Sequence, residues 1–156
     1  MKADEIPVAN TPPGGYGATM PPPILDACDE PLVAGAPDMR GLWRTVAVEW
    51  ANGNEPDPDP IADHVERIEQ CGNRVCITTT GIIHDMRADG TVDNGVHDVS
   101  AAAGGQEIVV VCTFEDGVHV LRPVGMPGIE VTRRLDGDQL VWTYGPMFTA
   151  RLERVT

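Results

Sequence analysis

The sequence predicts an all-β protein, a single antiparallel up-and-down β-barrel of about eight or nine strands that follows an irregular arm rich in Pro and Gly. Residues 107–156 hold five short apolar runs, rich in β-branched side chains and separated by turn residues. Nowhere does the chain show a convincing long helical period. Short consecutive strands of this kind form an antiparallel meander, and a meander protects its exposed edges by closing into a barrel or sandwich.

The turn residues set the expected strand limits in this C-terminal part. Asp136-Gly137 is a strong hairpin signal, because Gly adopts a positive φ without a Cβ clash. Glu115-Asp-Gly117 and Gly145-Pro146 end the neighbouring runs in the same way. The expected strands are residues 107–114, 118–122, 129–134, 139–144 and 148–155.

The middle of the chain is less regular. The first strand is expected at Gly41–Trp50, followed by a proline-rich acidic loop up to Pro60. Ile61, Val65 and Ile68 have helical spacing, but the turn that follows favours a hairpin arm that starts near His64. The remaining expected features are a strand at 75–83, a turn at 89–90, a weaker strand at 91–99 and a connector at 101–105.

Two units are expected, an arm at residues 1–40 and the barrel at residues 41–156. Repeated Pro and Gly prevent regular structure in the arm, and its few aliphatic residues cannot form a core of their own. Two roles stay open for the arm. It forms a lid over a barrel mouth, or it packs on its own barrel or on a neighbouring subunit and supports a homo-oligomer.

The amino-acid composition limits the kinds of partner that the protein can bind. With 11 basic and 24 acidic residues the net charge is −13, which argues against nucleic-acid backbones and anionic membrane surfaces as partners. No apolar run is long enough to span a bilayer, and the first residues lack a secretory apolar segment. These features predict a cytoplasmic protein.

The four cysteines are then expected to be reduced thiols. A disulfide between Cys71 and Cys76 across a hairpin stays conceivable. Their spacing matches no metal-site pattern, because no second Cys or His pair lies at ligand spacing. No metal and no cofactor are therefore expected.

Three features resemble the calycin superfamily, the lipocalins and fatty-acid-binding proteins. Gly41-Leu42-Trp43 resembles the lipocalin Gly-x-Trp signature, and Arg151 lies on the last strand, where these families place an arginine against that Trp. The third is the order of strands over residues 41–155. The resemblance implies a lipocalin-like barrel with a small hydrophobic ligand inside. The fatty-acid-binding Arg-x-Tyr pair reads Arg151-x-Glu153 here, and an acid at that place opposes binding of a fatty-acid carboxylate.

Several residues are candidates for chemistry or ligand contact. His84, His119 and Glu49 are the candidate acid/base groups. Strand alternation puts His119 on the face of Leu121, while Glu49 shares a face with Trp43 unless a bulge intervenes. The candidate ligand-binding residues are Trp43, His84, His119, Trp142, Tyr144 and Arg151.

The leading hypothesis is a barrel that binds a small, largely apolar molecule. Two alternatives stay open: an isomerase, cyclase or lyase that uses an interior acid/base residue, and an interaction module whose proline-rich arm contacts a partner. The sequence does not decide whether a reaction is catalysed.

Overall fold

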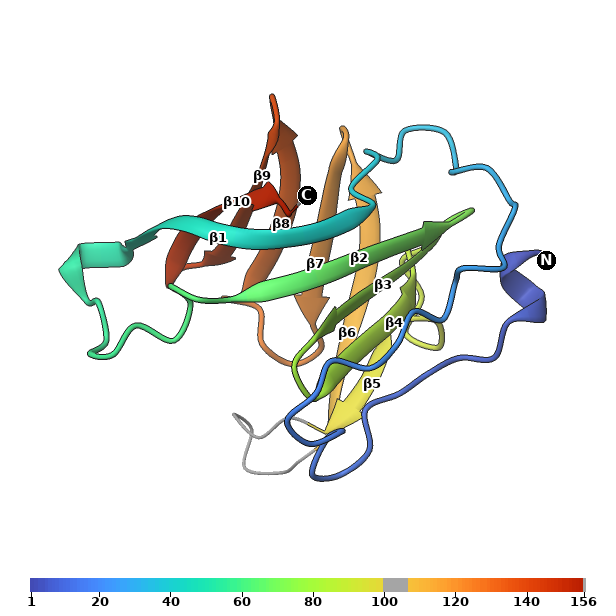
Figure 1. Ribbon diagram of the computed structural model, residues 1–156, viewed down its shortest axis with the longest axis horizontal. Helices are drawn as coiled ribbons and strands as arrows, with labels where there is room; N and C mark the ends of the chain where they lie inside the picture. Colours follow the sequence, from blue (N-terminus) through green and yellow to red (C-terminus); the bar gives the residue numbers. More distant parts are fainter. Residues whose placement is uncertain (100–106, 156) are drawn as a thin grey trace.

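A computed structural model describes residues 1–99 and 107–155, and in these ranges ten strands form one antiparallel sheet. The strands follow the order β4-β3-β2-β1-β10-β9-β8-β7-β6-β5, and the sheet curls into a nearly closed barrel (Figure 1). The predicted all-β up-and-down barrel is confirmed. The strands are β1 (Gly41–Trp50), β2 (Val65–Cys71), β3 (Arg74–Thr79), β4 (Ile82–Arg87), β5 (Val96–Val99), β6 (Glu107–Glu115), β7 (Val118–Pro123), β8 (Glu130–Asp136), β9 (Gln139–Gly145) and β10 (Phe148–Arg154).

The number of strands exceeds the expected eight or nine. The single strand expected at residues 75–83 is two strands, because the chain turns between Thr79 and Ile82, where Gly81 has a φ of 75°. The β-branched run before Gly81 hides this turn in the sequence. The strand expected at residues 91–99 is shorter, covering only Val96–Val99. The expected connector at residues 101–105 lies outside the described residues.

A β-bulge in β1 decides which side chains face inward. Trp43 and Thr45 are buried, the pairing with β10 shifts between Thr45 and Ala47, and Trp50 again packs against the core. A bulge inserts one extra residue and so reverses the alternation beyond it. Glu49 is therefore exposed on the outside. Of the two positions left open for Glu49, the structure has the one that follows from a bulge, and Glu49 does not face inward with Trp43.

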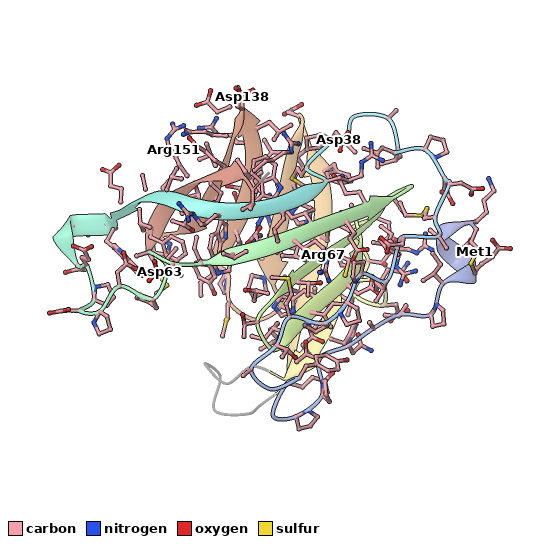
Figure 2. All side chains as sticks on the ribbon, in the orientation of Figure 1. Met1, Asp38, Asp63, Arg67, Asp138 and Arg151 are labelled. Atoms are coloured by element: carbon pink, nitrogen blue, oxygen red, sulfur yellow. A yellow bond between two sulfur atoms is a disulfide. The ribbon has the colours of Figure 1, made fainter. Side chains whose placement is uncertain are left out.

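One end of the barrel is closed around Trp43. Its indole Nε1 donates to the Met39 carbonyl at 2.8 Å, and the Arg154 guanidinium lies 4.3 Å from its ring centroid. The predicted packing of Arg151 on Trp43 is wrong. Phe148, Ala150 and Leu152 face inward on β10, so alternation turns Arg151 outward. There it donates to Asp136 at 3.0 Å, and Figure 2 shows Arg151 at the periphery of the barrel.

Residues 1–40 form a second, smaller core on the outer face of β2, β3 and β4 (Figure 1). This N-terminal segment contains no strand and one short 3-10 helix, η1 (Ala3–Glu5). The buried apolar residues between the segment and the sheet are Ala3, Leu25, Cys71, Cys76 and Ile83. These contacts place the segment against the outer wall of its own barrel. Of the two arrangements left open for the arm, this is the packed one and not the lid.

Buried polar contacts hold the N-terminal segment in place. Arg74 on β3 forms a two-bond ion pair with Asp85 on β4, at 2.8 and 2.6 Å. Its remaining donors reach the backbone carbonyls of Ala3, Ile6 and Pro7 at 2.6–2.9 Å. All five guanidinium N–H groups are thus used, as the burial of an arginine requires.

A disulfide joins Cys28 in the N-terminal segment to Cys71 on β2, with the Cα atoms 6.1 Å apart. The expectation of four reduced thiols is wrong for this pair. The conceivable Cys71–Cys76 bridge is wrong as well, because Cys76 pairs in the sheet with Glu69 and is a buried free thiol. Cys112 is the other buried free thiol in the described ranges.

Among the helices that the structure describes, none is long and apolar enough to cross a bilayer.

Breaking the disulfide should destabilise the protein. A bridge that spans 43 residues restricts the unfolded chain, so Cys28→Ser should lower the free energy of unfolding by roughly 2–4 kcal/mol. Urea unfolding of the oxidised and the reduced wild type measures the effect. The reductant should have no further effect on Cys28→Ser, and an unchanged midpoint in the reduced wild type contradicts the prediction.

Candidate functional site

A row of polar side chains lies on the inner face of three adjacent strands. His119 on β7 pairs with Arg133 on β8, and Arg133 pairs with Trp142 on β9, so all three share one face of the sheet. That face is the inner one, because their neighbours Leu121, Val131 and Leu140 lie in the main core. The three side chains are buried. Together with Glu66 they are called the interior polar band below.

Glu66 reaches Arg133 from the opposite wall of the barrel. Its carboxylate accepts two hydrogen bonds from the guanidinium, Nε to Oε2 at 2.8 Å and Nη2 to Oε1 at 3.0 Å. The imidazole Nε2 of His64 lies 2.7 Å from Oε1. Burial alone would raise the pKa of Glu66, but attraction to Arg133 and hydrogen bonds from His64 and Arg133 outweigh it and hold the pKa at about 2. The pair is therefore ionised and neutral in sum.

His119 is a buried neutral imidazole. Burial first, and then repulsion by Arg133, lower the pKa of His119 from its ordinary value of 6.5 to about 3. Its Nε2 contacts the Cys112 thiol at 3.1 Å, and burial raises the pKa of that thiol to about 12. Nδ1 of His119 has no hydrogen-bond partner among the described residues. The neutral ring can use this atom as a donor or as an acceptor.

Trp142 adds a second buried polar atom without a partner. Its indole Nε1 makes no hydrogen bond within the described part of the chain. The Arg133 guanidinium lies 4.8 Å from the ring centroid of Trp142, and the His64 ring centroid lies at 4.7 Å. A buried N–H group without a partner costs about 1–3 kcal/mol. A bound group that accepts this hydrogen bond would recover that free energy.

An aromatic cluster lies between the polar band and the end of the barrel opposite Trp43. Phe148 is at its centre, with ring centroids 4.9 Å from Trp50, 5.0 Å from Trp142 and 5.7 Å from Tyr144. The chain has only three Trp, two Tyr and two Phe, so four of these are gathered here. The indole of Trp50 donates to Asp59 at 3.0 Å, which ties the cluster to the loop between β1 and β2.

No protein-family model and no curated protein matches the sequence. Among solved structures, human cRBP IV superposes with a TM-score of 0.61 at 15% identity, covering 76% of this chain and 98% of its own. A mutant of the REP1-NXSQ fatty acid transporter gives 0.56 at 17% identity, covering 76% and 98%. The zebrafish ileal bile acid-binding protein complexed with cholic acid gives 0.56 at 18% identity, covering 74% and 98%.

The chain has the β-barrel fold of these three structures. The resemblance read from Gly41-Leu42-Trp43 and the strand order is confirmed at the level of the fold. At 15–18% identity the likeness to these structures concerns the fold alone.

The barrel brings together some of the predicted site residues. His119, Trp142 and Tyr144 all face the interior, the first two in the polar band and the third in the aromatic cluster. Trp43 is inside as well, but at the closed end. Whether these residues bind a ligand stays a prediction.

The other predicted site residues lie elsewhere. His84 faces β5, where its Nδ1 lies 2.5 Å from Asp98, and Asp98 also accepts a hydrogen bond from the Thr11 backbone at 2.7 Å. Unlike His119, His84 has no contact with the polar band in the described structure. Glu49 and Arg151 are on the outside of the barrel. Glu49 and Arg151 are therefore not groups of an interior site in this structure, whereas His84 lies opposite Ile77 of the main core, on the inner face of β4.

Sequence reasoning missed three residues, Glu66, Arg133 and His64. A signal for the first two existed, because period-two alternation puts Glu66 on the face of Ile68, and Arg133 on the face of Val131. Charged residues inside an apolar face indicate a buried pair. The sequence gives no way to predict that Glu66 and Arg133 pair with each other, since 67 positions separate them.

A hollow of about 140 Å³ lies between the N-terminal segment and the wall of the barrel. It is lined by Val8 and Asn10 of the N-terminal segment and by residues of β4, of β5 and of the turn before β5, including Asp93 in the turn and His97 on β5. The buried Arg74–Asp85 pair forms part of its wall, and the donors of Arg74 are already used. In residues 1–99 and 107–155, no group of three or more His, Cys, Asp or Glu side chains is arranged to hold a metal ion.

The buried neutral His119 should make the protein sensitive to mild acid. Between pH 6.5 and 3 the unfolded chain binds a proton on His119 that the folded chain excludes, so stability falls as the pH falls. From pH 7 to pH 5 this loss amounts to about 2 kcal/mol. Urea unfolding at both pH values should show a smaller loss for His119→Gln than for the wild type. The control is His97→Gln, which changes a half-exposed side chain on β5. Equal losses in His119→Gln and wild type contradict the prediction.

Proposed function

We propose that this protein binds one small, largely apolar molecule inside the barrel and holds its polar group against the interior polar band. The observation that carries the proposal is the pair of buried polar atoms without partners, Nδ1 of His119 and Nε1 of Trp142, in the described part of the chain. They flank Arg133 on the inner face of three adjacent strands. Native proteins leave few such atoms unpaired, so two in one interior row indicate a missing hydrogen-bond partner.

The aromatic cluster supports the apolar part of the proposal. Trp50, Tyr144 and Phe148 offer flat apolar surfaces beside the polar band. In this structure the rings contact one another, so a ligand enters by separating them. The loop between β1 and β2 moves with them, because Asp59 holds Trp50. In this proposal residues 41–156 bind the ligand and residues 1–40 brace the outer wall.

Two structural neighbours agree with this proposal by their names, a fatty acid transporter and a bile acid-binding protein complexed with cholic acid. Both are named for an amphipathic small molecule. An enzymatic role has weaker support from the geometry, because only His119 of the three candidate acid/base groups lies in the polar band. Binding requires no acid/base group.

The disulfide bears on where such a binding protein works. Cys28 and Cys71 are bridged, and disulfides persist mainly in oxidising compartments. This opposes the cytoplasmic location expected from the sequence. Counting free thiols by alkylation of native protein from its own cells tests the location: four reduced thiols restore the cytoplasmic expectation.

Binding should depend on the Trp142 indole. We expect the neutral dye Nile red to increase in fluorescence with the wild type, and 1-decanol to displace it. Trp142→Phe keeps an aromatic ring but removes the Nε1 donor, so decanol should bind about fivefold to tenfold more weakly, the loss of one hydrogen bond. Competition titrations measure both dissociation constants.

Tyr16→Phe is the matched control, because Tyr16 lies in the N-terminal segment and donates to the Asn10 carbonyl. It should bind decanol as the wild type does. The proposal fails if the wild type takes up neither Nile red nor decanol. It also fails if Trp142→Phe and His119→Gln both bind decanol as tightly as the wild type does.

A further inference from the structure

Glu66 makes the contacts with Arg133 that a bound carboxylate would make. Two parallel N–H···O bonds of 2.8 and 3.0 Å join the planar guanidinium to the planar carboxylate. This two-pronged geometry is the one with which arginine recognises carboxylates in general. Within the barrel, an anion that approaches Arg133 therefore meets a group that is already paired.

The pair crosses the interior and is not confined to one wall. Glu66 belongs to β2 and Arg133 to β8, and β1, β10 and β9 lie between these two strands in the sheet order. The side chains of both residues are almost fully buried, 0% exposed for Glu66 and 6% for Arg133. A ligand inside the barrel must lie beside this pair. The imidazole Nε2 of His64 also contacts the Glu66 carboxylate, 2.7 Å from Oε1.

We propose that Glu66 sets the charge class of the ligand: by pairing with Arg133 inside the barrel, it makes the site accept a neutral hydroxyl or carbonyl group and reject a carboxylate. This inference rests on the proposed function, because it concerns the ligand of the same site. The neutral partners for such a group are Nε1 of Trp142 and Nδ1 of His119, one on each side of Arg133 and both unpaired within the described residues.

Electrostatics explains the rejection. A ligand carboxylate can take Arg133 only if it displaces Glu66, which leaves a buried carboxylate without its cation. Breaking a buried pair in this way is strongly unfavourable. If Glu66 stays in place, two carboxylates share one guanidinium and repel each other. A hydroxyl group avoids both penalties.

The loop between β1 and β2, beside the aromatic cluster, also disfavours an anionic ligand. Residues 51–64 carry Glu55, Asp57, Asp59 and Asp63 and no Lys or Arg. With Asp59 bonded to Trp50, these charges lie next to the aromatic end of the barrel. A cluster of one sign lowers the local concentration of ions of that sign. Anionic amphiphiles are therefore disfavoured at the entrance as well as inside.

The test compares 1-decanol with decanoate, which share a chain and differ in the charge of the head group. At neutral pH, Nile red competition should show that the wild type binds decanol at least about tenfold more tightly than decanoate. In Glu66→Gln the Arg133 charge loses its internal partner, so decanoate should gain at least about tenfold relative to decanol. Glu49→Gln, on the outside of β1, is the matched control and should keep the wild-type ratio.

The melting temperature is a second readout, for the case in which Glu66→Gln is only weakly folded. Decanoate should raise the melting temperature of Glu66→Gln and leave that of the wild type unchanged, because only the variant offers an unpaired guanidinium. A double variant, Glu66→Gln with Arg133→Gln, removes both charges and should lose this response to decanoate.

The outcomes separate the two proposals. Equal binding of decanol and decanoate by the wild type overturns the role of Glu66. So does an unchanged ratio in a Glu66→Gln variant that still binds decanol, or a melting temperature of Glu66→Gln that decanoate does not raise. If neither the wild type nor any variant binds either ligand, the proposed function fails, and the inference about Glu66 fails with it.

Discussion

The structure depends on the buried ion pair between Glu66 and Arg133. It connects β2 with β8 across the interior, at a place where a barrel is otherwise filled with apolar side chains. Removing one partner of such a pair costs about 3–5 kcal/mol, because the other charge is left buried. The pair therefore fixes the two walls relative to each other and occupies the polar centre of the site. Its neighbours His119 and Trp142 are positioned by the same strand register.

A second buried ion pair has a comparable role on the outer wall. Arg74 and Asp85 connect β3 with β4, and the remaining donors of Arg74 bind backbone carbonyls of the N-terminal segment. A segment this rich in Pro and Gly forms no strand and only one short 3-10 helix of its own, so the barrel must supply many of its hydrogen-bond partners. The Cys28–Cys71 bridge adds a covalent link at the same face. The Glu66–Arg133 pair thus connects two walls of the barrel, and Arg74 attaches the N-terminal segment to the outer wall.

The sequence predicts the barrel because strands and turns are local. Period-two patterns and Gly-containing turns need only neighbouring residues, and the turn that was missed, at Gly81, lies inside a β-branched run. Which residues face the site depends on non-local features, namely bulges and the register between strands. One bulge in β1 moves Glu49 outside, and the register of β10 brings Arg154 in place of Arg151 to Trp43. Neither the bulge nor the pairing of Glu66 with Arg133 can be read from local pattern.

The shared fold and the individual site carry different information. The nearly closed barrel is the fold that the structural neighbours have in common with this chain at 15–18% identity. What the interior can bind depends on its charges, and here an internal carboxylate neutralises the internal arginine. Under the proposed function, two polar atoms beside this neutral pair, unpaired in the described structure, favour a ligand that exchanges hydrogen bonds without bringing charge. A site of this kind differs from an anion site by one residue, although the surrounding sheet stays the same.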